Sequence, residues 1–168
     1  MSTPKYLPRI ILSLVLLHAI TFTIAQSITL SVHGEGWGFV VAPPSNWTLD
    51  RRSLHKYGIE GLFLPAEAAY APDKLYLCIL NPGTKLAAAE VATDNLKPNG
   101  EVETASFQKV ALFSAGTKSG SQQRLLGILD DGGHRFVFFL SASSPALFEQ
   151  GKMAFHELIS SFVLLEPE

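Results

Sequence analysis

Cysteine is nearly absent from this sequence of 168 residues, since Cys78 is the only one. A single thiol excludes an internal disulfide framework and any zinc or iron–sulfur site built from several cysteines. Charge is also scarce: Asp, Glu, Lys and Arg make up 17%, and 13 basic residues face 15 acidic ones, for a net charge of −2. Nucleic-acid binding needs a basic surface that attracts phosphates, so this balance argues against a nucleic-acid partner.

The scarcity of charge goes with a high apolar content, which excludes a disordered chain. Hydrophobic residues make up 47% of the sequence. Chains that stay unfolded have few apolar residues and a large net charge, and this chain has neither feature. The sequence contains no linker, repeat or low-complexity segment, and its length fits the roughly 100–200 residues of one domain.

Only the N-terminus carries a long run without charge. Lys5 and Arg9 precede it, and the run extends over Ile10–Ala25. Thr23 and Ala25 place small residues at positions −3 and −1 of a cleavage site, so the pattern predicts a signal peptide over residues 1–25. The mature domain would then be 26–168, in the periplasm or secreted.

The alternative to cleavage is an anchor helix that stays attached and makes the protein a membrane-tethered interaction domain. The run Ile10–Ala25 is shorter than the roughly 20 apolar residues that a spanning helix needs, which favours cleavage. No cysteine stands at the end of this run, which excludes a bacterial lipoprotein anchor. The rest of the chain has no run of comparable length, so we expect no stable membrane span once the leader is removed.

Short apolar or alternating segments bounded by Gly and Pro predict a mainly extended domain. The predicted strands are Gln26–His33, Trp37–Val41, Gly61–Leu64, Leu75–Leu80, Thr104–Ser114, Gln122–Leu129 and His134–Ser141. Asp130–Gly133 predicts a hairpin turn between the last two, because glycine tolerates the positive φ of such turns. The continuous apolar run Phe136–Leu140 predicts a central strand, and Leu75–Leu80 one that is covered on both faces.

Two segments have helical spacing. Thr84–Leu96 is rich in alanine, and Pro98 and Gly100 are expected to end it. The clearer helix has Ser144 as N-cap and Pro145 at its first position, followed by apolar residues every three or four positions as far as Val163. Strands joined by short turns with two amphipathic helices predict an α+β fold, with an antiparallel β-sheet and helices packed on it.

Three short motifs resemble a known family. They are Pro43-Pro44-Ser45-Asn46-Trp47, the segment Gly58–Pro65 with its Phe63-Leu64-Pro65, and the late helix ending Leu158-Ile159-Ser160-Ser161-Phe162. Together they resemble small exported bacterial proteins of the PsbP-like superfamily, which includes DcrB-like and Mog-like proteins. The resemblance implies an α/β/α sandwich and an accessory or binding role, and it implies no catalytic residues.

Two groups of residues are candidates for a reactive centre. His33-Gly34-Glu35-Gly36 is similar to an esterase oxyanion loop, but the sequence has no Gly-x-Ser-x-Gly elbow, and Gly116–Gly120 has a different spacing that indicates a hairpin loop. Asp130, Asp131 and His134 could ligate a divalent metal, with Asp50 and His55 elsewhere in the chain. A closed zinc site needs about four ligands, so these acids are interpreted as exposed turn residues.

Other residues that could bind a partner have simpler explanations. The basic segment Arg51-Arg52 with His55 and Lys56 could steer an anionic ligand, and a solvated loop is the favoured interpretation. Most of the aromatic side chains are expected in the core, with Tyr70 as the best candidate for exposure. Cys78 is expected to be a buried apolar thiol. These aromatic residues are Trp37, Phe39, Trp47, Phe63, Tyr70 and Tyr76.

The sequence therefore predicts an exported, non-enzymatic accessory or binding protein whose partner is an unidentified protein or small molecule of the cell envelope. It predicts no catalytic, cofactor or metal residues. The alternatives are a hydrolytic or metal-assisted enzyme that uses His33 with Glu35 or Asp131 with His134, and the membrane-tethered domain described above. Convergence of these side chains in one concave pocket would favour the enzyme.

The leader prediction has a direct test. We expect the intact mass of the exported protein to correspond to residues 26–168, because the small residues before Gln26 direct cleavage there. A mass that still includes residues 1–25 would show the tethered form instead.

Overall fold

The computed structural model describes residues 29–51, 59–66, 74–80, 82, 96–116 and 122–166. These parts of the chain form ten β-strands and one α-helix. The strands are β1 (Leu30–Gly34), β2 (Trp37–Val41), β3 (Trp47–Leu49), β4 (Ile59–Pro65), β5 (Leu75–Leu80), β6 (Leu96–Glu103), β7 (Lys109–Gly116), β8 (Gln123–Asp131), β9 (His134–Ala142) and β10 (Val163–Leu165), and the helix is α2 (Pro145–Ser160).

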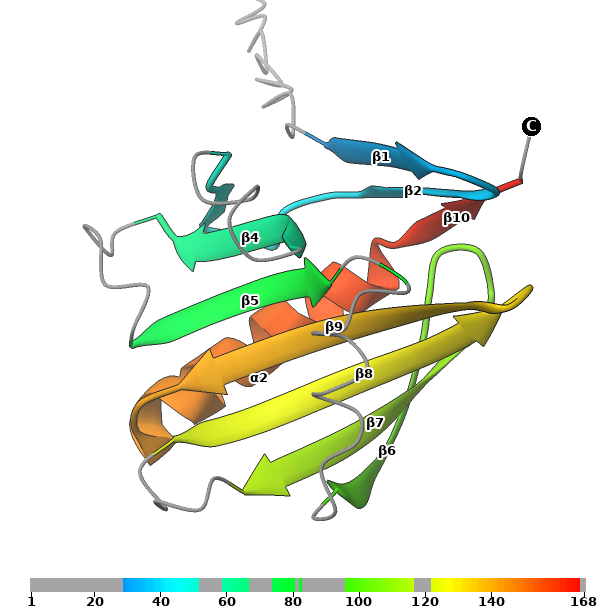
Figure 1. Ribbon diagram of the computed structural model, residues 1–168. Helices are drawn as coiled ribbons and strands as arrows, with labels where there is room; N and C mark the ends of the chain where they lie inside the picture. The colour runs from blue at the N-terminus through cyan, green and yellow to red at the C-terminus, as the bar shows by residue number, and fades with distance from the viewer. Residues whose placement is uncertain are drawn as a thin grey trace, which may run out of the picture.

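The strands build two antiparallel sheets (Figure 1). The larger has seven strands in the order β3-β4-β5-β9-β8-β7-β6, and the smaller has three in the order β1-β2-β10. β9 lies at the middle of the larger sheet between β5 and β8, which confirms the central position predicted from its apolar run. The antiparallel sheet of the predicted α+β class is thus present, but as two sheets where one was predicted.

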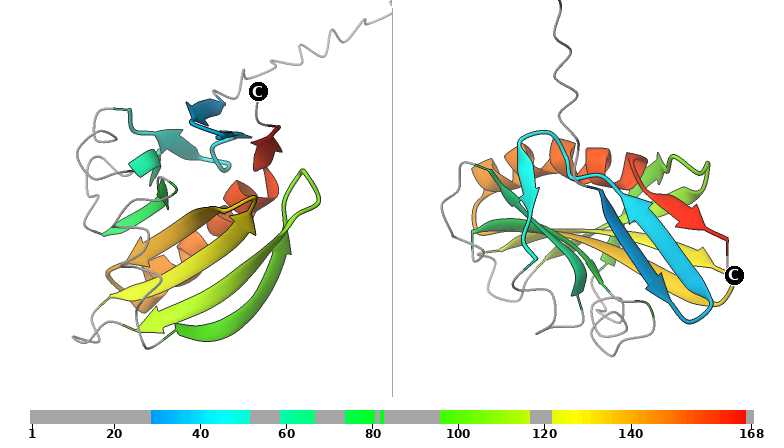
Figure 2. Two further views of the ribbon diagram at one scale, coloured as in Figure 1. Left: turned by 45° about the vertical axis from the view of Figure 1, so that its right-hand side comes forward. Right: turned by 90° about the horizontal axis from the view of Figure 1, so that it is seen from above.

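Helix α2 lies across one face of the larger sheet, as the views in Figure 2 show. It begins as predicted, with the Ser144 Oγ accepting a hydrogen bond from the Leu147 backbone N–H at 3.3 Å and Pro145 following it. Such capping satisfies one of the free N–H groups of the first turn. No helix among the described residues is long and apolar enough to cross a membrane.

The larger sheet has apolar side chains on both faces because residues alternate along each strand. Leu77 and Ile79 of β5 join the core beneath α2, whereas Cys78 and Leu80 join a second buried cluster on the opposite face. This confirms that β5 is covered on both faces. It also explains why its sequence is apolar at every position.

Five aromatic rings connect the two sheets. Phe162 is completely buried, and its ring centroid lies 5.1 Å from Phe39 on β2, 5.6 Å from Phe136 on β9 and 5.0 Å from Phe138 on β9. Trp37 packs against Phe39 and Phe136 at 6.2 and 5.9 Å. We call these five residues the aromatic cluster.

The last helix ends earlier than its apolar spacing predicts. It stops at Ser160, and Val163 belongs to β10, which pairs with β2. Where the helix ends, the Ser161 Oγ accepts a hydrogen bond from the Ala42 N–H at 3.1 Å and lies 2.9 Å from the Leu158 carbonyl oxygen. The apolar spacing does not predict this change from helix to strand, because Phe162 and Val163 are apolar and fit the buried stripe in either conformation.

The predicted helix Thr84–Leu96 meets the structure only at its last residue, since residues 84–95 lie outside the described part of the chain. Leu96 is wrong as a helix end, because it begins β6. Pro98 and Gly100 lie inside this strand. An edge strand tolerates proline, and the positive φ of Gly100 (92°) goes with the register shift between Pro98 and Glu101. Whether a helix covers the second face, as an α/β/α sandwich requires, stays a prediction.

The predicted strand Thr104–Ser114 is wrong over its first half. Residues 104–108 form the loop between β6 and β7, and only Lys109 onwards is extended. Thr104 is a buried polar residue, 4% exposed, whose Oγ1 accepts from the Gln108 N–H at 3.1 Å. A side chain that bonds its own loop in this way favours a turn over a strand.

The aromatic cluster should contribute strongly to the stability of the fold. Replacing Phe162→Ala should lower the free energy of unfolding by about 3–5 kcal/mol, because it leaves a cavity shared by both sheets. Urea unfolding of the two proteins measures this loss. Met153→Ala is the matched control: Met153 is 72% exposed on α2, and its loss should change stability by less than about 0.5 kcal/mol. Equal effects of the two changes would contradict the role given to the cluster.

Candidate functional site

Two hairpin turns that carry predicted candidate residues lie together. The β1–β2 turn contains Glu35 and Gly36, and the β8–β9 turn lies between Asp131 and His134. A Cβ built on Gly36 would lie 3.6 Å from the His134 Nε2, so the two turns are neighbours although about a hundred residues separate them. We call the end of the molecule formed by these turns, β10 and loop 104–108 the hairpin end (Figure 1).

Packing of Trp37 holds the β1–β2 turn in this place. Its ring lies over Gly34, where an added Cβ would be 2.1 Å from the Trp37 Cε2. Gly34 therefore has to lack a side chain, and the ring continues onto Phe39 and Phe136 of the aromatic cluster. The glycine that was considered part of an oxyanion loop instead makes room for an aromatic ring.

The β8–β9 turn confirms the hairpin predicted for Asp130–Gly133, with φ values of 55° and 92° at Gly132 and Gly133. Its acids are engaged in surface contacts. The Asp130 carboxylate accepts two hydrogen bonds from Arg135, one of them at 3.0 Å from Nη2, and this contact raises the pKa of the Arg135 guanidinium. The Asp131 Oδ1 accepts from the Gln108 Nε2 at 3.4 Å.

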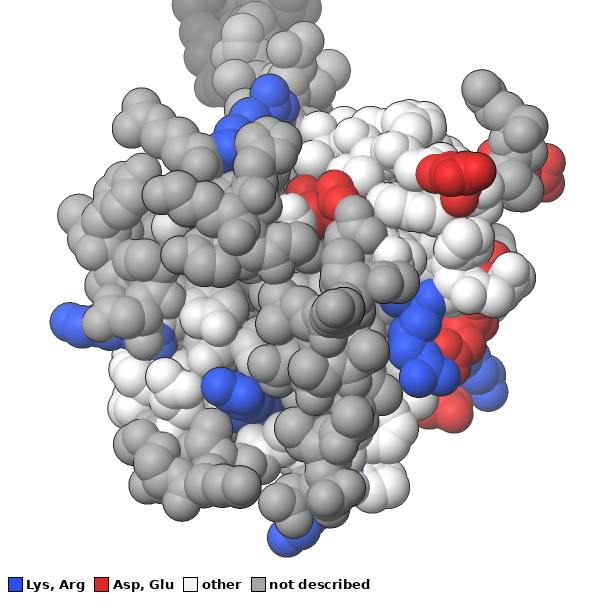
Figure 3. Space-filling model, viewed as in Figure 1, with Lys and Arg blue, Asp and Glu red and all other residues white. Residues whose placement is uncertain are grey.

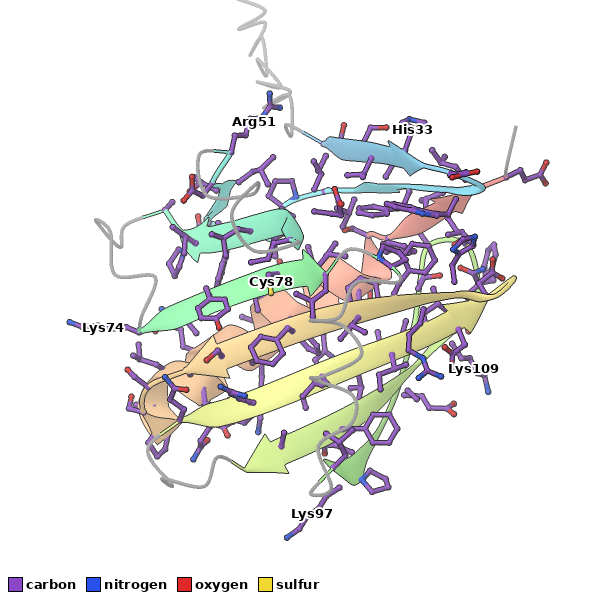
Figure 4. All side chains as sticks on the ribbon, viewed as in Figure 1. His33, Arg51, Lys74, Cys78, Lys97 and Lys109 are labelled. Atoms are coloured by element: carbon purple, nitrogen blue, oxygen red, sulfur yellow. The ribbon has the colours of Figure 1, made fainter. Side chains whose placement is uncertain are left out.

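His33 lies on β1, the edge strand of the smaller sheet (Figure 4). Its Nε2 is 3.1 Å from the Ser31 Oγ, and its Nδ1 would be 3.3 Å from a Cβ on Gly38. The ring is thus held against its own hairpin and contacts a hydroxyl group. The Ser31 hydroxyl is within hydrogen-bonding distance of the ring, but among the described residues no acidic side chain bonds the ring to orient it as a general base.

The candidate metal ligands do not gather at one point. Among the described residues, no three His, Cys, Asp or Glu side chains are placed to hold a metal ion. Asp50 follows β3, where its backbone N–H donates to the Leu62 carbonyl oxygen at 2.8 Å. His55 lies outside the described residues, as do Arg52 and Lys56 of the basic segment, and Arg51 is exposed.

The aromatic residues considered for binding are mostly core residues, as expected. Phe39 and Phe63 are fully buried, and Trp37 and Trp47 pack against the same core. Tyr76 packs on the opposite face. Tyr70 lies outside the described residues, so its exposure stays a prediction. Cys78 is 2% exposed, which confirms that it is a buried thiol.

A polar row on the face of the larger sheet opposite α2 was missed by the sequence reasoning. Tyr76, Ser141 and Arg124 are register partners on β5, β9 and β8. The Arg124 guanidinium carbon lies 5.4 Å from the Phe139 ring centroid, and the Tyr76 ring lies 6.0 Å from the same ring. The sequence signal that could have revealed this row is the alternation of side chains in β8, which places Arg124 on the same face of the sheet as Leu126. The row positions a cation against aromatic surface, and Ser141 is 4% exposed within it.

No protein-family model matches the chain, and no curated protein matches it. Solved structures similar to this chain include the following two. The cyanobacterial PsbP (CyanoP) of Synechocystis sp. PCC 6803 has 13% identity and a TM-score of 0.44, over 85% of this chain and 96% of CyanoP. LpqN of Mycobacterium tuberculosis, described as involved in cell envelope biogenesis, has 15% identity and a TM-score of 0.42, over 83% of this chain and 91% of LpqN.

One of these two proteins is a PsbP, the family that the sequence motifs resemble. Both TM-scores are below 0.5 and both identities are below 25%, so the two structures carry no functional argument for this chain. The family resemblance stays a prediction from the motifs.

The Trp37 ring leaves no room for a side chain at Gly34. Gly34→Ala should lower the free energy of unfolding by about 1–3 kcal/mol, because the new methyl group overlaps the Trp37 ring and the ring must move. Denaturant unfolding measures the loss, and Trp37 fluorescence in a Trp47→Phe background should change at the same time. Ser31→Ala on the same strand is the control, since Ser31 is exposed and its loss should leave the Trp37 emission unchanged.

Proposed function

We propose that this protein is an exported, non-enzymatic accessory protein that binds a partner of the cell envelope. The observation that carries the proposal is how the candidate acid–base groups at the hairpin end are used. Asp130 binds Arg135, Asp131 binds Gln108, and His33 contacts Ser31. The first contact spans the β8–β9 hairpin, the second joins that turn to loop 104–108, and the third lies within β1.

The charged contacts of this end are exposed, which also supports a binding surface. The Arg135 and Asp130 side chains are 50% and 60% exposed. Catalytic groups usually have pKa values shifted by burial, and a guanidinium whose pKa is raised by a surface carboxylate stays protonated and transfers no proton. Surface pairs of this kind set specificity and association rates more than affinity.

The leader sequence supports export, because Lys5 and Arg9 precede the uncharged run Ile10–Ala25, as in a signal peptide. The role as a binding protein is supported by the resemblance of the three motifs to accessory proteins of the PsbP-like superfamily.

Affinity purification tests the proposal. The full chain with a C-terminal tag is expressed in its own host, and the cell envelope is extracted with mild detergent after cross-linking. We expect the processed protein to be found outside the cytoplasm and to carry a partner in near-stoichiometric amount. Recovery in the cytoplasm, or as a processed protein with no bound molecule, would contradict the proposal.

A variant without the candidate reactive groups separates binding from catalysis. The double change His33→Ala and His134→Ala removes one member of each candidate pair and should retain the same partner in the same amount, because these residues act in the hairpins and not in a reaction. The control is the unchanged chain purified in parallel. Loss of a chemical conversion in the envelope extract with this folded variant would favour the enzyme instead.

A further inference from the structure

Phe107 is placed in a conformation that its side chain disfavours. Its φ is 63°, in the left-handed region, where a bulky side chain is a clear outlier. The other described residues with positive φ are types that adopt it readily: Gly36, Asn46, Gly100, Gly132 and Gly133. Phe107 is also 84% exposed, so burial of its ring within this chain does not offset the strain.

Loop 104–108 holds Phe107 in this conformation through a dense set of hydrogen bonds. The Phe107 N–H donates to the Thr104 carbonyl oxygen at 3.0 Å, and the Gln108 N–H donates to the Thr104 Oγ1 at 3.1 Å. The Ser106 Oγ lies 3.2 Å from both the Thr104 Oγ1 and the Gln108 Oε1. A strained residue persists only where its surroundings determine its conformation, and this loop meets that condition.

Three further contacts fix the loop to the rest of the hairpin end. The Ala105 N–H donates to the carbonyl oxygen of Phe162 at 3.1 Å, and the Leu164 N–H donates to the Ser106 Oγ at 3.3 Å. The Gln108 Nε2 reaches the Asp131 Oδ1 of the β8–β9 turn. The exposed ring is therefore presented by a rigid support, which lowers the entropy lost when a partner immobilises it.

Acidic side chains surround the loop. Glu101 and Glu103 end β6, and Asp131 contacts Gln108, whereas Lys109 is the cation at the start of β7 and pairs with Glu101 at 3.5 Å. Figure 3 shows red side chains beside the blue ones at the place that Figure 4 labels Lys109. These four side chains have a net negative charge, so they attract a basic surface and repel an anionic membrane.

We propose that Phe107 is the anchor of a protein–protein interface, with its ring inserted into an apolar pocket of a partner protein whose rim carries Lys or Arg. The inference rests on the proposed function and identifies the surface that performs it. Aromatic anchors in partner pockets supply much of the energy of an interface, and complementary charges around them supply specificity. One ring buries too little apolar area to hold a protein on a lipid surface by itself.

Site-specific photocross-linking tests the surface. The full chain carries benzoylphenylalanine at position 107, or at one of two control positions: 153 on α2, where Met153 is the other large apolar residue exposed among the described residues, and 97, where Lys97 is exposed on β6. Each protein is irradiated in its own host. We expect one partner to be captured from position 107 and not from 153 or 97.

The captured partner is then purified and titrated with the full chain. Phe107→Asn should weaken its binding by about tenfold or more, as for an anchor residue, and Met153→Ala should leave it unchanged. Binding should weaken as salt rises, because the acidic surroundings contribute by charge. An affinity that Phe107→Asn does not change, or that salt does not change, would overturn the proposal.

Phe107→Asn also separates lost binding from lost folding. Asn adopts the left-handed region more readily than Phe, so this variant should have a higher midpoint of thermal unfolding than the unchanged protein. A more stable variant that loses the partner shows that Phe107 is kept for binding. A lower midpoint of thermal unfolding would show that Phe107 is not strained, and this would overturn the inference.

The remaining outcomes distinguish this inference from the proposed function. Capture from position 153 or 97 but not from 107 would overturn the interface at Phe107 and leave the accessory role standing. No capture from any position would overturn both. Cross-linking of position 107 to a second copy of this chain, or Phe107-dependent binding to vesicles of phosphatidylglycerol, would replace the proposed partner and overturn the inference.

Discussion

The packing of Phe162 is the contact on which the arrangement of the molecule depends. This residue follows the last turn of α2, and its ring touches Phe39 of the smaller sheet and Phe138 of the larger one. Its backbone carbonyl also accepts the hydrogen bond from Ala105 that fixes loop 104–108. Helix, both sheets and the loop therefore meet at one buried residue. Movement of this ring would disturb all four, because well-packed cores transmit displacement instead of absorbing it.

The hairpin end follows from this packing. β2 carries Phe39 and Trp37, so anchoring these rings brings the β1–β2 turn against His134. β9 carries Phe136 and Phe138, so the same cluster places the β8–β9 turn. The polar residues there join turns that packing has already placed: Gln108 reaches Asp131, and Ser106 reaches β10. The result is a rigid support that leaves one strained aromatic ring exposed.

Residue types alone predict the local position of some site residues but not their partners. Asp131 and His134 were correctly placed at a hairpin turn, because the pair Gly132-Gly133 indicates a turn directly, whereas the β1–β2 turn beside His33 was not predicted. Their partners were not foreseeable, since the contacts of Asp131 with Gln108 and of Gly36 with His134 join segments far apart in the chain. Phe107 was passed over because its sequence context predicts a strand, and only a backbone torsion sets it apart.

Local patterns were sufficient for β2, β5, the final hairpin and the start of α2, because each depends on neighbours in the sequence: alternation, a glycine pair or a Ser-Pro cap. They also predicted the antiparallel α+β class and the burial of Cys78. The division into two sheets, the end of α2 at Ser160 and the strand β10 were decided by tertiary structure alone. Val163–Leu165 becomes a strand because β2 offers it hydrogen-bond partners, and the Ser161 side chain at the end of the helix bonds the backbone of Ala42. Such partners come from more than a hundred residues away, and a local pattern holds no information about them.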